Sequence, residues 1–209
     1  MNLEICPLKL GETLSGTNDA GDLLNDSWLG QIFEIPANNV GAASIRGAKK
    51  RLVGRPLKVV LLRNTSGIKL YGKRLAQLSL VAGYAGLKEV IGYSIAANTL
   101  NCVLIDPYLA TSGVADDDIF LGILEGPVLA KVQTLAAGSV MTMGMMLACG
   151  SGAVSSLAAA ATGGVTLGPG GLAGHSAATV ASIIGRALSG RTTADTGADV
   201  LINACIRTF

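Results

Sequence analysis

The sequence predicts a mainly β protein with a small β-barrel or β-sandwich core, one short helix and an extended N-terminal arm. Two observations carry this prediction. From Leu57 onward, short apolar runs recur roughly 8 to 14 residues apart, with turn residues between them. In the last run, residues 198–209, apolar and polar positions alternate with the period of two that places one face of a strand in a core. Strands without intervening helical patterns favour a barrel or sandwich over βαβ units.

Residues 1–55 form the predicted arm, and residues 56–209 form the predicted β-rich domain. The arm is rich in Gly, Asn, Asp and Ser, and its apolar runs are short. Trp28, Ile32 and Phe33 are unusual on a free tail, since large apolar side chains are mostly buried. We therefore expect these three residues to anchor the arm against a neighbouring molecule, so that the arm orders on assembly.

The strands expected in the domain are 58–64, 68–80, 101–110, 119–133, 139–148 and 198–209. Between the first two, Asn64-Thr65-Ser66-Gly67 predicts a tight turn in which Gly67 or Asn64 adopts a positive φ. The expected helix covers 175–190, where His175 or Ser176 is a candidate N-cap. Gly185 weakens that helix, because glycine has a low helix propensity.

Charge is distributed in blocks along the chain. Residues 1–45 carry a net charge of −5, residues 46–74 contain ten bases and no acid, and residues 75–131 carry −4. Blocked charge indicates surfaces that face other charged surfaces. The basic block could be a solvated face, a phosphate-binding surface, or a surface that meets acidic patches on a protein partner. The third interpretation is favoured, with these bases as the electrostatic contact: Arg46, Lys49, Lys50, Arg51 and Arg55.

Binding of single-stranded nucleic acid usually needs aromatic side chains among the bases, and Tyr71 is the single aromatic residue in the block. Duplex recognition usually needs a recognition helix, which the strand pattern does not offer. A nucleic-acid-binding β-barrel that uses residues 46–74 therefore remains the alternative function. We therefore do not expect a nucleic-acid partner.

No catalytic, cofactor or metal site is expected. His175 is the single histidine, and no G-x-S-x-G motif accompanies it, so a hydrolase using His175 or Ser176 is the least favoured class. Asp116-Asp117-Asp118 lacks the ligand spacing of a calcium loop and fits a solvated turn. The glycine-rich residues 163–171 lack the Gly-Lys-Ser/Thr ending of a phosphate-binding loop. The four cysteines form no C-x-x-C pair and fit free thiols in a reducing cytosol.

No membrane partner is expected either. Residues 132–185 contain no Asp, Glu, Lys or Arg, but Ser, Thr and Gly interrupt their apolar positions every few residues. A transmembrane helix needs about 20 consecutive, predominantly apolar residues. The first sixteen residues lack the basic and apolar regions of a secretory signal.

Four motifs follow one another along the chain: "LLRNTSGIKLYGKRLAQL", "GYAGLKEVIGYS", "GVADDDIFLGILEGPVLAKV" and "IIGRALSGRTTADTGADVLINACI". In this order they resemble the decoration (cement) proteins of tailed-bacteriophage capsids. In that family an RN-S/T-S-G turn follows the first core strand, a strand ending in EGP opens the next hairpin, and an IGRAL…TTA pair closes the chain. The resemblance covers residues 57–209, with a longer glycine-rich insertion at 163–174 than the family pattern. The corresponding residues are Arg63–Gly67, Glu125–Pro127, Ile184–Leu188 and Thr192–Leu201.

The resemblance implies a β-tulip-like barrel and a structural, non-enzymatic role in the virion. A protein of this family binds the outer surface of the major capsid lattice and stabilises the expanded head. Its implied partners are the major capsid protein and other copies of itself, commonly as a homotrimer. Its implied location is the capsid exterior, after assembly in the host cytoplasm.

Overall fold

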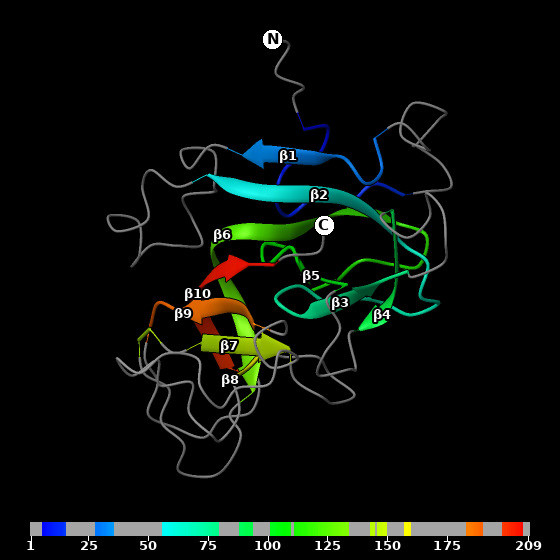
Figure 1. The fold of residues 1–209 in the computed structure, drawn as a ribbon. Coiled ribbons are helices and arrows are strands. Elements are labelled where there is room, and N and C mark those ends of the chain that lie inside the picture. Colours follow the sequence, from blue (N-terminus) through cyan, green and yellow to red (C-terminus); the bar gives the residue numbers. More distant parts are fainter. Residues whose placement is uncertain are drawn as a thin grey trace.

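The computed structural model describes residues 6–15, 28–35, 56–79, 88–93, 101–109, 111–133, 143–144, 146–149, 157–159, 183–189 and 198–206. All regular structure in these residues is β (Figure 1). The strands are β1 (Ile32–Ile35), β2 (Leu57–Asn64), β3 (Leu75–Leu78), β4 (Glu89–Tyr93), β5 (Cys102–Ile105), β6 (Ile119–Gln133), β7 (Met146–Cys149), β8 (Leu157–Ala159), β9 (Ile183–Ala187) and β10 (Ala198–Cys205). The predicted β-rich fold class is confirmed.

The strands pair into two closed circuits that share β6. The first circuit runs β2, β4, β3, β5, β6 and back to β2, and only the β2–β4 pair is parallel. The second runs β6, β10, β9, β7, β8 and back to β6. β1 extends the sheet beside β2, and Figure 1 shows β6 passing from the upper to the lower group of strands. The long β6 thus joins two barrel-like units into one sheet.

Side chains of the first circuit alternate between two hydrophobic clusters. Val60 and Leu62 of β2 pack with Phe120 of β6 in a cluster to which all five strands of the circuit contribute, which places this cluster inside the ring. Their neighbours Leu61 and Leu121 belong to a second cluster on the other face. A strand buried on both faces is apolar along its whole length, which explains the uninterrupted Val-Val-Leu-Leu run of β2.

Several local predictions are confirmed. In β10, Ile202 and Ala204 are buried while Cys205 is exposed, and the following Ile206 is also buried, as the alternating pattern indicates. Gly67 adopts the positive φ of 71° expected in the 64–67 turn.

The strand expected at 68–80 is only partly correct. Leu70 forms a single bridge to Val114, and regular pairing begins again at Leu75. Lys73, between them, has a positive φ of 70°, which is incompatible with continuous β structure. The chain therefore turns twice before β3.

The helix prediction was wrong for Ile183–Ala187, which forms β9 between β10 and β7. Two successive isoleucines favour a strand, and Gly185 fits the sheet because a Cβ at this position would lie 2.8 Å from the carbonyl oxygen of Asn203. The first part of the expected helix, 175–182, with His175 and Ser176, lies outside the described residues.

The two described parts of the predicted arm lie against the β domain. Leu14 and Ile119 exchange two backbone hydrogen bonds of 3.0 and 2.8 Å, and Leu8 is buried in the same cluster as Ile119. β1 pairs antiparallel with β2, which buries Phe33. Within residues 6–15 and 28–35, the arm is thus integrated into the domain of its own chain.

Candidate docking surface

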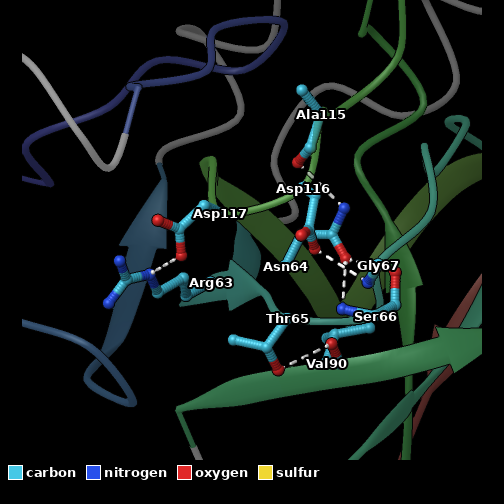
Figure 2. A network of polar contacts seen from close by, with 9 residues as sticks. All are labelled: Arg63, Asn64, Thr65, Ser66, Gly67, Val90, Ala115, Asp116 and Asp117. Carbon is cyan, nitrogen blue, oxygen red and sulfur yellow. Dashed lines mark hydrogen bonds and ion pairs between the residues drawn. The ribbon is translucent and has the colours of Figure 1, made fainter.

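The segment 64–74, called the corner below, is organised by the buried side chain of Asn64 at the end of β2. Its amide nitrogen donates hydrogen bonds of 2.9 Å to the carbonyl oxygens of Ile68 and Ala115. Its amide oxygen accepts one from the backbone N–H of Ser66 at 3.1 Å and one from the Ser66 hydroxyl at 2.6 Å. Asn favours such turns because its short side chain bonds to the backbone two residues on. Figure 2 shows Asn64 between Ser66 and Gly67 of the corner and the 115–117 segment.

The aspartate-rich loop holds the corner from the other side. Asp116 Oδ1 accepts a hydrogen bond of 2.8 Å from the backbone N–H of Gly67, and Asp117 Oδ1 lies 2.7 Å from Arg63 Nε (Figure 2). In addition to forming the predicted turn, this loop holds the backbone of the corner through the Asp116 carboxylate and through the N–H of Asp117, which donates a 2.6 Å hydrogen bond to the carbonyl oxygen of Asn64. No group of three or more His, Cys, Asp or Glu side chains suited to a metal ion occurs within the described residues.

The corner presents two large apolar side chains to solvent on a firmly held backbone. Ile68 is 48% exposed and Tyr71 is 42% exposed. Between them, Leu70 is buried and exchanges backbone hydrogen bonds of 2.9 and 2.7 Å with Val114. The N–H of Tyr71 donates a 2.8 Å hydrogen bond to the phenolic oxygen of Tyr93. Contiguous exposed apolar surface, more than single apolar side chains, marks interaction sites, and Ile68 and Tyr71 are the large apolar side chains that the corner contributes to such a surface.

Tyr71, Arg74 and Tyr93 form a compact group, called the tyrosine–arginine cluster. The guanidinium carbon of Arg74 lies 5.8 Å from the ring centroid of Tyr71 and 5.5 Å from that of Tyr93. Both distances are within the range of cation–π attraction. Lys69 adjoins the cluster, because a Cβ added to Gly113 would lie 3.1 Å from Tyr71 Cδ1 and 3.2 Å from Lys69 Cγ.

Sequence reasoning missed this cluster. Tyr93 is 22 residues beyond Tyr71, and only the pairing of β3 with β4 brings the two together. The signal in the sequence was Tyr93, which lies in the motif GYAGLKEVIGYS, but no spacing rule connects that motif to the corner.

The predicted basic surface is only partly described. Lys58 Nζ lies 2.7 Å from Glu125 Oε2, and Arg63 pairs with Asp117, so these two bases are balanced within the chain. Lys69 and Arg74 are on the corner. The five bases predicted as the electrostatic contact, Arg46, Lys49, Lys50, Arg51 and Arg55, lie outside the described residues.

The three predicted arm anchors have different environments. Phe33 is buried in the core of its own chain, and the partly buried Trp28 stacks on it with ring centroids 6.0 Å apart and an interplanar angle of 13°. Ile32, on the opposite face of β1, is 51% exposed. Of the three, Ile32 is the one that offers a large apolar surface to a neighbour.

Asp106, at the end of β5, is a fully buried carboxylate that sequence reasoning also missed. It accepts hydrogen bonds from the N–H groups of Gly11 at 2.6 Å and Tyr108 at 2.8 Å. Burial raises the pKa of Asp106 from 3.8 to about 6, although the two N–H groups oppose that shift. Both partners are backbone groups, so the geometry is that of a tether for the N-terminal segment.

The fold and the corner define a mainly β protein with an ordered, exposed apolar and cationic surface. No protein-family model matches the chain, and no curated protein matches it. Within the described residues there is no helix long and apolar enough to span a membrane.

Proposed function

We propose that the protein is a structural virion protein that binds the outer surface of the major capsid lattice of a tailed bacteriophage and stabilises the expanded head. Four ordered motifs in residues 57–209 support this proposal through their resemblance to capsid decoration proteins. A protein that binds only the expanded shell stabilises it by its binding free energy, repeated at every site. Several copies arranged with closed symmetry, as a homotrimer, add avidity.

The corner is the contact that we assign to this function. Its supporting observation is the exposure of Ile68 and Tyr71 on a backbone that Asn64, Asp116 and Tyr93 hold by hydrogen bonds. A surface that is ordered before binding loses little conformational entropy when the partner docks. Tyrosine and arginine are also the residues that most often dominate interface energies.

Co-sedimentation with expanded, undecorated tailed-phage capsids tests the proposal. We expect saturable binding near one copy per capsid subunit, and weaker binding at high salt, since exposed charges are screened. Absence of binding by protein that is folded by circular dichroism would overturn the proposal.

Variants locate the contact in the same assay. Tyr71→Ala is expected to weaken binding at least ten-fold, because truncating a central aromatic residue commonly costs about 2 kcal/mol. Lys58→Gln is the matched control, since Lys58 is already paired with Glu125 away from the corner. Ile32→Ala tests the predicted arm anchor, and charge reversal at Lys49, Lys50 and Arg51 tests the predicted basic contact. Unchanged binding in any of these variants removes that residue set from the contact.

A further inference from the structure

Two cations of the corner, Lys69 and Arg74, form no ion pair with the acidic loop beside them in the part of the chain that the structure describes. Asp116 is engaged by the N–H of Gly67, Asp117 by Arg63, and Asp118 Oδ2 by the N–H of Ala115 at 3.1 Å. Within the described residues the structure gives neither Lys69 nor Arg74 an ion pair. The corner therefore has two cationic side chains whose charge remains available to a partner.

The guanidinium of Arg74 is held in place but keeps hydrogen-bonding capacity. Its backbone carbonyl accepts a 2.8 Å hydrogen bond from Ile105, and its head group lies against the rings of Tyr71 and Tyr93. Its Nε is buried and has no hydrogen-bond partner within the described residues, so an incoming carboxylate would be met by the terminal N–H groups of this partly exposed side chain. A guanidinium has five N–H donors in a planar fork that matches a carboxylate.

We propose that the tyrosine–arginine cluster and Lys69 bind a carboxylate-bearing segment of a protein partner. The carboxylate is received by Arg74, Lys69 supplies a second positive charge, and apolar atoms beside the carboxylate pack on Tyr71. Carboxylates bound to arginine form charge-assisted hydrogen bonds, which are stronger than neutral ones. The inference rests on the proposed function for its partner, which is the capsid surface.

The surrounding charge favours a short acidic segment over a nucleic acid. A polynucleotide brings a continuous row of phosphates, and its affinity comes largely from many phosphate contacts. Asp116 and Asp117 lie on the loop that contacts the corner, and both would repel such a row. A segment with one or two carboxylates brings much less negative charge to that loop and can still engage Arg74 and Lys69.

The test compares two probes by fluorescence anisotropy: a labelled 12-residue peptide with two Asp residues flanked by apolar residues, and a labelled oligothymidylate. We expect the wild-type protein to bind the peptide more tightly. Lys69→Glu and Arg74→Gln are each expected to weaken peptide binding at least ten-fold at low salt, and Lys58→Gln less than two-fold. Lys69 is exposed, so its variant keeps the assay valid even where Arg74→Gln lowers stability. Arg74→Lys is expected to restore binding only partly, because lysine keeps the charge but lacks the fork.

The outcomes separate this inference from the proposed function. Tighter binding of the oligothymidylate, or peptide binding unaffected by either variant, overturns the inference in favour of another partner. Absence of peptide binding by the wild-type protein also overturns it. Capsid co-sedimentation that persists in Lys69→Glu and Arg74→Gln leaves the proposed function standing without this contact. Peptide binding by a protein that does not co-sediment with capsids supports carboxylate binding by the cluster and excludes the capsid as its partner.

Discussion

The carboxylate of Asp106 accepts a hydrogen bond of 2.6 Å from the backbone N–H of Gly11, although 95 residues separate the two in sequence. This bond fastens the N-terminal segment 6–15 to the end of β5 at a site from which water is excluded. Gly11 has a φ of 88°, and a Cβ at this position would lie 2.9 Å from the carbonyl oxygen of Tyr108, so glycine is required for the close approach.

The Asp106 tether predicts a pH-dependent term in stability. Because burial raises the pKa of Asp106 from 3.8 to about 6, the folded state binds a proton more tightly than the unfolded state between these values. The contribution of this group to the free energy of unfolding therefore falls as pH rises from about 4 to about 6, by about 3 kcal/mol in total. Urea unfolding gives the free energy of unfolding of the wild type and of Asp106→Asn at each pH. The difference between the two is expected to change with pH across this range. Parallel curves would contradict the prediction.

Removal of the Asn64 side chain is expected to destabilise the protein by about 2 to 3 kcal/mol. Asn64→Ala leaves the part-buried carbonyl of Ala115 and the part-buried N–H of Ser66 without their partner, and an unsatisfied group costs about 1 to 3 kcal/mol when it is buried. Thr65→Ala is the neighbouring control, with an expected change within about 0.5 kcal/mol, since Thr65 is exposed and the Val90 carbonyl that its hydroxyl contacts at 3.3 Å keeps the Thr65 N–H as donor. Chemical unfolding measures both, and equal changes would show that Asn64 does not organise the corner.

Tyr93→Phe is expected to loosen the corner without disturbing the sheet. The substitution removes the phenolic oxygen that accepts the hydrogen bond from Tyr71 N–H, while the ring stays beside Arg74. The expected loss is about 1 kcal/mol, the net contribution of one hydrogen bond. Amide hydrogen exchange is expected to accelerate at Tyr71 and to stay unchanged at Val103 in β5. Unchanged exchange at Tyr71 would refute the proposed role of Tyr93.

Gly185→Ala distinguishes the observed strand from the predicted helix by the sign of its effect. In a helix the substitution stabilises by about 1 kcal/mol. In β9 the new Cβ would lie 2.8 Å from the backbone oxygen of Asn203, and overpacking of this kind costs about 1 to 3 kcal/mol. Arg186→Ala is the control, because Arg186 is exposed. Increased thermal stability of Gly185→Ala would support the helix.

The sequence predicted the strands whose pattern is set by local burial. β5, β6 and β10 each fall within an expected apolar run, and β2 begins one residue before its own, because burial on one or both faces leaves a direct signal in composition. Segment 183–187 was misassigned as the end of a helix over 175–190, because periodicity does not distinguish a short buried strand from a helix segment, and only the pairing with β10 decides between them.

The corner was foreseen only as a turn. A tight turn depends on residues that are neighbours in sequence, so the positive φ of Gly67 could be predicted. The contacts of Asn64 with Ala115, of Tyr71 with Tyr93 and of Gly11 with Asp106 all join segments distant in sequence. Such contacts depend on strand order, and periodicity in a single sequence contains no information on that order.

The position of β6 in both strand circuits limits how the gene for this protein can diverge. The first half of β6, residues 119–125, pairs with β2 and β5, and the second half, residues 125–133, pairs with β10 and β8. One residue inserted into β6 would turn the side chains that follow it to the opposite face, so the two halves could no longer keep both sets of pairings. Insertions between other strands disturb one circuit or none. Homologous chains are therefore expected to keep the length of β6 constant while their lengths diverge elsewhere.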